Sequence, residues 1–338
     1  MEKFKDSNKI RLQGELLKKR LQDEGYLFLA ALIPKEDVLK VRQKMISILN
    51  EFGWIDNSSG NKLDDAVGNE QAFVPDTDPV SNSIMKKQIS SFIIRDLQHH
   101  RNLISLFKRI FDHSVFPLPR VIPRTLFPNQ DEHTTPPHQD YPHVQGSRFS
   151  YAAWIPLGDC EKDMGGLAIA SQSNKEGVLP IIPAMGAGGM AVLDKYQDQW
   201  RFNPLSSGDV IIFNCLTVHK GVPNHSKKLR ISIDMRYQAT SDTVCEDWLK
   251  PHRNLISWEE LYKDWPDKKT QYYWRECRVK TVPFNDIYYE KRNKLAFQMS
   301  HQGDKNALAT LKRIHRIALE NKDGNMLKKV NNAIQRLN

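Results

Sequence analysis

Residues 230–238 alternate strictly between polar and apolar side chains, and this stretch constrains the fold more than any other. Side chains two positions apart in a β-strand point to the same face of the sheet. One face of the predicted strand therefore carries Arg230, Ser232, Asp234, Arg236 and Gln238. A guanidinium matches a carboxylate through two parallel hydrogen bonds. Arg230 could thus bind the far carboxylate of a dicarboxylic molecule, unless it is simply a solvated strand residue.

His138 and Asp140 are also two positions apart, and they follow the turn-forming residues 134–137. If residues 138–140 are extended, both side chains converge on one spot while Gln139 turns away. A third group, His219, follows the apolar run 210–213, which predicts a buried strand. Two imidazoles and one carboxylate form the ligand set of non-haem Fe(II) oxygenases. A His-x-Asp pair alone could equally be a surface pair, and His133 is a competing ligand.

The order of these motifs resembles the phytanoyl-CoA dioxygenase-like Fe(II)/2-oxoglutarate oxygenases. A His-x-Asp motif, a Gly-Asp-led apolar strand, a second histidine and an arginine eleven residues later occur in that order. Residues 23–29, 154–157 and 165–169 agree as well, so the resemblance runs roughly from 21 to 238. It implies a mainly β core with flanking helices, arranged as a double-stranded β-helix, the cupin-like jelly roll.

The resemblance also implies roles for individual residues. His138, Asp140 and His219 would bind Fe(II), with 2-oxoglutarate and O2 as cosubstrates. Arg230 would hold the far carboxylate of 2-oxoglutarate, and Trp154 would line its pocket, unless Trp154 is a core residue.

A second contact to this carboxylate is less clear from the sequence. Family members often carry Ser or Thr two residues after the second histidine, where this chain has Gly221. Ser232 is the substitute we expect, because it shares a strand face with Arg230. The candidate substrate contacts are Tyr141, His143 and Arg236.

The resemblance implies oxidative decarboxylation of 2-oxoglutarate to succinate and CO2. Relatives that halogenate replace the ligand aspartate by a small residue, so Asp140 favours hydroxylation, or a related desaturation or ring closure. We expect a small substrate, either anionic or a natural-product intermediate. The sequence pI near 9.2 leaves a nucleic-acid or protein substrate as the alternative, although no zinc knuckle or RNA-recognition signature is present. A catalytically dead, cupin-like binding protein is a further alternative.

Hydrophobic patterning predicts the remaining elements. Strands are expected at 26–32 and 148–157, and a loop near the cavity mouth at 53–79. Helices are expected at 8–24, from Pro34 onward, at 82–112, at 306–320 and at 326–337. We expect an oxygenase domain at 1–243 and a helical, basic extension at 244–338 that packs on it.

The extension carries nearly all of the net positive charge of the chain. From residue 251 onward there are 18 Lys and Arg against 10 Asp and Glu, and the whole chain has a net charge of +9. The extension could close over the cavity or form a homo-oligomer interface through its helices. No apolar run approaches a membrane span, and the four cysteines lack paired or zinc-like spacing. We therefore expect a cytoplasmic protein without membrane partners.

Overall fold

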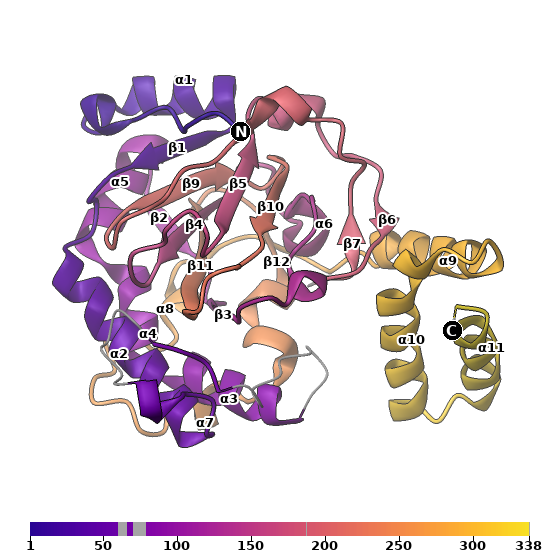
Figure 1. Cartoon of the computed structure of the whole chain (residues 1–338). Coiled ribbons are helices and arrows are strands. Elements are labelled where there is room, and N and C mark those ends of the chain that lie inside the picture. The colour runs from indigo at the N-terminus through magenta and orange to yellow at the C-terminus, as the bar shows by residue number, and fades with distance from the viewer. Residues whose placement is uncertain (60–65, 70–78, 187, 338) are drawn as a thin grey trace.

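The computed structural model describes residues 1–59, 66–69, 79–186 and 188–337 (Figure 1). Its centre is a six-stranded antiparallel sheet with the order β1-β9-β4-β11-β2, in which β3 also pairs with β11. These strands are β1 Tyr26–Leu29, β2 Val115–Pro117, β3 Ile122–Leu126, β4 Tyr151–Pro156, β9 Val210–Asn214 and β11 Arg230–Ala239. The alternating stretch is therefore a strand, β11, as predicted.

Three helices cover the outer face of the large sheet. They are α1 Gly14–Glu24, α2 Lys35–Glu51 and α5 Arg101–Phe111. Their apolar stripes form one core with the apolar face of β11, which carries Ile231, Ile233, Met235 and Tyr237. The polar face of β11 must then point toward the interior of the barrel, and all ten residues of the strand are buried.

A smaller sheet, with the order β10-β5-β8, lies over the inner face of the large one (Figure 1). Its strands are β10 His219–Val222, β5 Gly166–Ala170 and β8 Trp200–Arg201. Leu167 and Ile169 of β5 pack against Trp154, Ile211 and Phe213 of the large sheet. The molecule thus has the double-stranded β-helix core with flanking helices that the resemblance implied.

Several predicted elements differ in their limits. The helix expected at 8–24 is a short 3-10 turn, Asn8–Ile10, followed by α1. The helical region expected at 82–112 contains α3 Pro79–Ser90, α4 Phe92–Asp96 and a 3-10 turn, Leu97–His99, before α5. Of the loop expected at 53–79, residues 60–65 and 70–78 lie outside the described part of the chain.

The first part of the C-terminal extension packs against the barrel. It includes β12 Val244–Cys245, α7 Trp258–Tyr262, α8 Tyr273–Glu276 and β13 Thr281–Val282. An aromatic cluster of Trp248, Trp258, Tyr262 and Trp274 joins it to Phe116 of β2. This packing accounts for most of the tryptophans that stand among charged residues in this stretch.

The last three helices form a separate small bundle at the side of the barrel (Figure 1). They are α9 Ile287–His301, α10 Leu308–Glu320 and α11 Gly324–Gln335, and their shared core contains Ala296, Leu311 and Val330. Helix α9 approaches the hairpin of β6 Ile182–Pro183 and β7 Met190–Ala191. Among the described helices, none is long and apolar enough to cross a membrane.

Candidate metal centre and active site

His138 and His219 face each other across a pair of backbone hydrogen bonds. The amide of each residue donates to the carbonyl of the other, at 2.9 and 3.0 Å, and the two form an isolated antiparallel bridge. Their imidazole centroids lie 4.1 Å apart. The backbone therefore fixes the separation of the two histidines.

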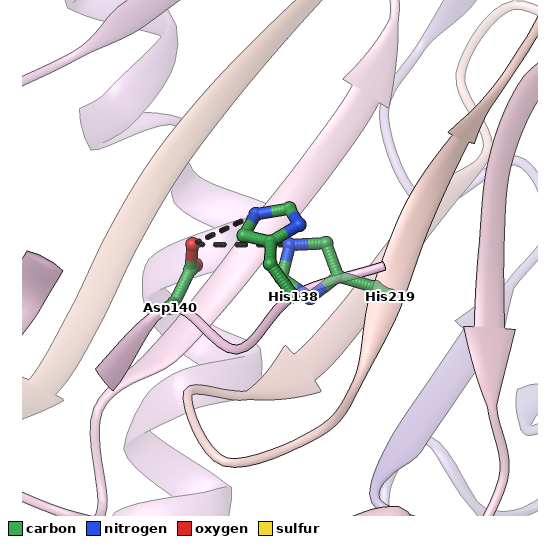
Figure 2. A group of neighbouring side chains, drawn as sticks. All are labelled: His138, Asp140 and His219. Atoms are coloured by element: carbon green, nitrogen blue, oxygen red, sulfur yellow. Dashed lines mark ion pairs between the residues drawn. The ribbon is translucent and has the colours of Figure 1, made fainter. Parts of the chain in front are cut away.

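The prediction that residues 138–140 are an extended strand is wrong. Asp140 has helical angles, φ −72° and ψ −28°, and caps the short helix α6, Tyr141–Val144. The chain turns directly after the bridge. This turn, rather than the two-residue period of a strand, brings the Asp140 carboxylate back toward the imidazoles (Figure 2).

The three side chains offer ligand atoms that all lie within 4.8 Å of one another. Nε2 of each histidine is 3.8 Å from Oδ1 of Asp140 (Figure 2). Nδ1 of His138 contacts the Pro136 carbonyl at 2.9 Å, and Nδ1 of His219 contacts the Thr217 carbonyl at 3.0 Å. A carbonyl can only accept, so each Nδ1 carries the proton and each Nε2 keeps its lone pair. This donor set fits a divalent metal such as Fe(II).

The charge states also suit a metal. Burial lowers the pKa of both histidines, His138 well below its ordinary value, so the imidazoles are neutral. Burial alone would raise the pKa of Asp140, but Arg236 and the two histidines hold it below its usual range. Two neutral nitrogens and one carboxylate thus stand ready as ligands.

Arg236 of β11 supports the carboxylate ligand. Its Nη2 donates to Oδ2 of Asp140 at 2.7 Å, which leaves Oδ1 turned toward the histidines. Its guanidinium also lies 5.0 Å from the ring centroid of Trp248. The structure therefore places this predicted substrate contact behind the metal centre, as a partner of Asp140.

Arg230, at the other end of the same strand face, is a buried cation. It is 7% exposed, its Nε has no hydrogen-bond partner, and no carboxylate among the described residues pairs with it. Burial lowers its pKa. Its nearest aromatic neighbour is Trp154, whose ring centroid lies 5.7 Å from the guanidinium. An uncompensated buried cation of this kind fits the carboxylate of a bound 2-oxoglutarate.

Ser232 lies between Arg230 and Asp234 on this face, and its buried hydroxyl has no hydrogen-bond partner within the described part of the chain. Position 221, where family members often carry Ser or Thr, leaves little space for such a side chain in this protein. A Cβ at Gly221 would lie 2.9 Å from Cγ2 of Thr134. Arg124 forms an ion pair with the nearby Asp234 and is therefore not a second unpaired cation beside Arg230.

The other predicted residues lie around the centre. The ring centroid of His143 is 6.5 Å from that of His138, and burial lowers the pKa of His143 to about 4. Tyr141 points toward α9, where its ring meets Tyr288 at 6.4 Å. His133, the competing ligand, is outside the cluster and lies in a 3-10 turn.

Sequence reasoning missed several residues that approach the centre from the extension. These are Trp248, Tyr289, Arg292 and Arg313. For the two arginines the basic composition of the tail was the only signal, and composition does not indicate which cations turn inward. Gln139 was correctly expected to turn away, since its amide contacts the carbonyls of Gly177 and Leu216.

Comparison with known proteins places this site in context. Residues 21–232 match the family described as phytanoyl-CoA dioxygenase. A Streptomyces exfoliatus protein named 1-deoxypentalenic acid 11-beta-hydroxylase is 25% identical over 268 residues, which cover 74% of this chain and 88% of the relative. The protein of the same name from Streptomyces arenae is 26% identical over 288 residues, with coverage of 77% and 92%.

A solved structure shows the same fold at low identity. The apo form of the non-heme monooxygenase ThoJ aligns with a TM-score of 0.51 and 11% identity, covering 88% of this chain and 99% of that chain. At this identity the likeness concerns the arrangement of the elements alone.

Proposed function

The chain belongs to the phytanoyl-CoA dioxygenase family and is an Fe(II)/2-oxoglutarate-dependent oxygenase, and we propose that it hydroxylates an unactivated C–H bond of a small molecule. The observation that carries this proposal is the combination of two histidines and a carboxylate at metal-binding distances with an unpaired, buried arginine on the neighbouring strand. The three ligand side chains suit Fe(II), and the buried arginine suits a dicarboxylate. An oxygenase that depends on 2-oxoglutarate requires both.

In this proposal His138, Asp140 and His219 hold the iron through Nε2, Oδ1 and Nε2. When bound, Fe(II) supplies the oxidising chemistry that uses O2, converts 2-oxoglutarate to succinate and CO2, and hydroxylates the substrate. Arg236 keeps the Asp140 carboxylate ionised and oriented. The carbonyls of Pro136 and Thr217 keep both imidazoles in the tautomer that ligates.

Arg230 binds the far carboxylate of 2-oxoglutarate, and the Ser232 hydroxyl, which bonds to none of the described residues, donates to the same group. Trp154 covers the guanidinium from one side and keeps water away from the ion pair. A salt bridge in such a dry site discriminates strongly for a dicarboxylate, because a monocarboxylate would leave the arginine uncompensated.

For the substrate, the names of the relatives support a natural-product intermediate. Asp140 occupies the position that a halide would need, which supports hydroxylation. 1-Deoxypentalenic acid is therefore the first compound to test, followed by other polycyclic acids of similar size.

The deciding experiment is an anaerobic titration of the purified full-length chain. Fe(II) and 2-oxoglutarate together should produce a weak visible charge-transfer band that neither produces alone. Admission of O2 with a candidate substrate should then give succinate and a product heavier by one oxygen atom in equal amounts. If the band is missing with both components at saturation, the proposed function is wrong.

A further inference from the structure

Four side chains from the barrel and from the extension meet beside the candidate metal centre. His143 of α6, next to the ligand His138, has its Nδ1 3.0 Å from the hydroxyl of Tyr289 in α9. The guanidinium of Arg292, one helical turn further along α9, lies 5.0 Å from the Tyr289 ring centroid. Arg313 of α10 is close enough to act on both His143 and Arg292 electrostatically. A row of contacts thus leads from a metal ligand to two arginines of the extension.

Arg292 is a buried cation that has no counter-ion among the described residues. It is 6% exposed, and its hydrogen bonds go to the neutral side-chain oxygen of Asn293, at 3.1 Å from Nε and 2.9 Å from Nη2. In the described part of the chain no Asp or Glu forms an ion pair with it. Burial, reinforced by the positive charge of Arg313, lowers its pKa to about 10. A buried cation such as Arg292 is unfavourable unless an anion binds it.

Two glycines of the β6–β7 turn pack closely against these groups. Gly189 has φ +62°, and a Cβ there would lie 1.8 Å from Nη1 of Arg313, so any side chain would displace the guanidinium. A Cβ at Gly188 would meet only Nε2 of His143, at 3.8 Å. The turn can therefore accommodate the Arg313 guanidinium only because residue 189 is a glycine, and it brings Gly188 close to Nε2 of His143.

We propose that Arg292, with Arg313 beside it, binds the acidic group of the substrate, so that the C-terminal extension selects an anionic substrate for the metal centre. The acidic group is an oxyanion, either a carboxylate or a phosphate ester, because both match the planar fork of a guanidinium. This inference rests on the proposed function of the centre. It assigns a specificity role to residues that lie beyond the matched family region, which ends at residue 232.

A second basic site on α9 provides a matched control. A cavity of about 630 Å³ lies between residues 178–181 and α9, and its lining includes Lys291 and Lys294. Lys294 is exposed, lies on the same helix as Arg292 and carries the same charge. Lys294→Gln therefore removes one positive charge from α9 without touching the row of contacts to His138.

The test measures anion binding by the metal-free, full-length chain. Calorimetric titrations with sodium propionate and with inorganic phosphate, at constant ionic strength, compare the wild type with Arg292→Gln, Arg292→Lys and Lys294→Gln. We expect Arg292→Gln to weaken binding by about tenfold or more, since a charged hydrogen bond is lost, and Arg292→Lys to weaken it less. Lys294→Gln should bind as the wild type does. Preference for propionate or for phosphate distinguishes a carboxylic acid from a phosphate ester.

Thermal unfolding of the ligand-free variants provides a second measurement. Removal of an uncompensated cation should leave the Tm of Arg292→Gln equal to that of the wild type or raise it, whereas loss of a structural residue would lower it. The proposal fails if the wild type binds neither anion, if Arg292→Gln binds as tightly as the wild type, or if Lys294→Gln alone loses binding. These outcomes are independent of the charge-transfer band, which Arg292→Gln should retain if the proposed function holds.

Discussion

At the scale of single residues, the candidate ligands meet through backbone geometry that their spacing does not determine. The two-residue interval suggested convergence of His138 and Asp140 on a strand, but the structure achieves it with a bridge followed by a helical turn. The ion pair of Asp140 with Arg236 was not predictable, because it joins residues 96 positions apart. Sequence reasoning could name the residues but could not determine which of the buried arginines had a partner.

His219→Ala is expected to abolish the charge-transfer band and weaken Fe(II) binding sharply, because two ligands remain where three barely suffice. Equilibrium dialysis of the variant against Fe(II) measures this directly. His133→Ala is the control and should bind iron normally, since His133 lies outside the cluster. Full metal occupancy in His219→Ala would remove this residue from the site.

Arg230→Ala should raise the 2-oxoglutarate concentration needed for the charge-transfer band by more than about a hundredfold, since loss of one partner of a buried ion pair costs roughly 3–5 kcal/mol. Fe(II) binding should hardly change. Arg230→Lys should rescue only part of the affinity, because a lysine lacks the planar fork. Unchanged cosubstrate affinity in Arg230→Ala would show that another cation binds the carboxylate.

At the scale of elements, long and strongly patterned segments were predictable and short ones were not. The strand at 230–238 and the helices near 306–320 and 326–337 correspond to β11, α10 and α11. Strands such as β6, β7, β8, β12 and β13 contain two residues each, too few for a period to show. The polar face of β11 is buried because the small sheet covers it. This packing of two sheets is tertiary structure, which the local sequence pattern does not predict.

Gly221→Ser tests how tightly β10 fits against the segment before His138. A serine at position 221, which relatives often carry, would place its Cβ 2.9 Å from Cγ2 of Thr134. We therefore expect a loss of roughly 1–3 kcal/mol in the free energy of unfolding. Urea denaturation measures it. Gly324→Ser is the control, since a Cβ at 324 meets nothing within 4 Å and the change should stay within about 0.5 kcal/mol. Equal stability of the two variants would contradict this packing argument.

At the scale of the whole molecule, the extension has two parts with different attachments. Residues of its first part share an aromatic core with the barrel, whereas α10 and α11 pack mainly on α9. The boundary at 243/244 therefore separates sequence regions more clearly than it separates hydrophobic cores, and the division into an oxygenase domain and a packed extension stays a prediction. Periodicity found the helices but not their partners, because an apolar stripe does not specify what covers it.

Deletion of residues 303–338 should uncover the apolar face of α9 around Ala296, which Leu311 and Val330 cover in the intact chain. We expect the shortened chain to bind a hydrophobic dye and to associate, as gel filtration would show. The charge-transfer band should remain, because all proposed iron and 2-oxoglutarate contacts precede residue 239. A monodisperse product without dye binding would show that α10 and α11 are dispensable for covering α9.

The contact between barrel and extension should also respond to pH. His99 packs edge-on against Tyr273, with centroids 4.7 Å apart, and burial lowers its pKa from 6.5 to about 4. The unfolded chain takes up a proton near pH 6.5 while the folded chain does not, so stability should fall as pH decreases from there, by at most about 1.4 kcal/mol per unit. His99→Phe should be less sensitive to acid over this range in urea denaturation. If the free energy of unfolding depends on pH in the same way in the wild type and in His99→Phe, this prediction is wrong.

The backbone bridge between His138 and His219 has a consequence for metal supply. Because hydrogen bonds set the distance between the two imidazoles before any ion arrives, the protein does not select its metal by folding around it. For a site with two nitrogen ligands and one oxygen ligand at fixed positions, the affinities for metal ions follow the general order, in which Co(II), Ni(II) and Cu(II) bind more tightly than Fe(II). Occupancy by iron is then decided by which ions the cell keeps available, and chain isolated in the presence of traces of nickel or copper should carry those ions and be inactive until they are exchanged.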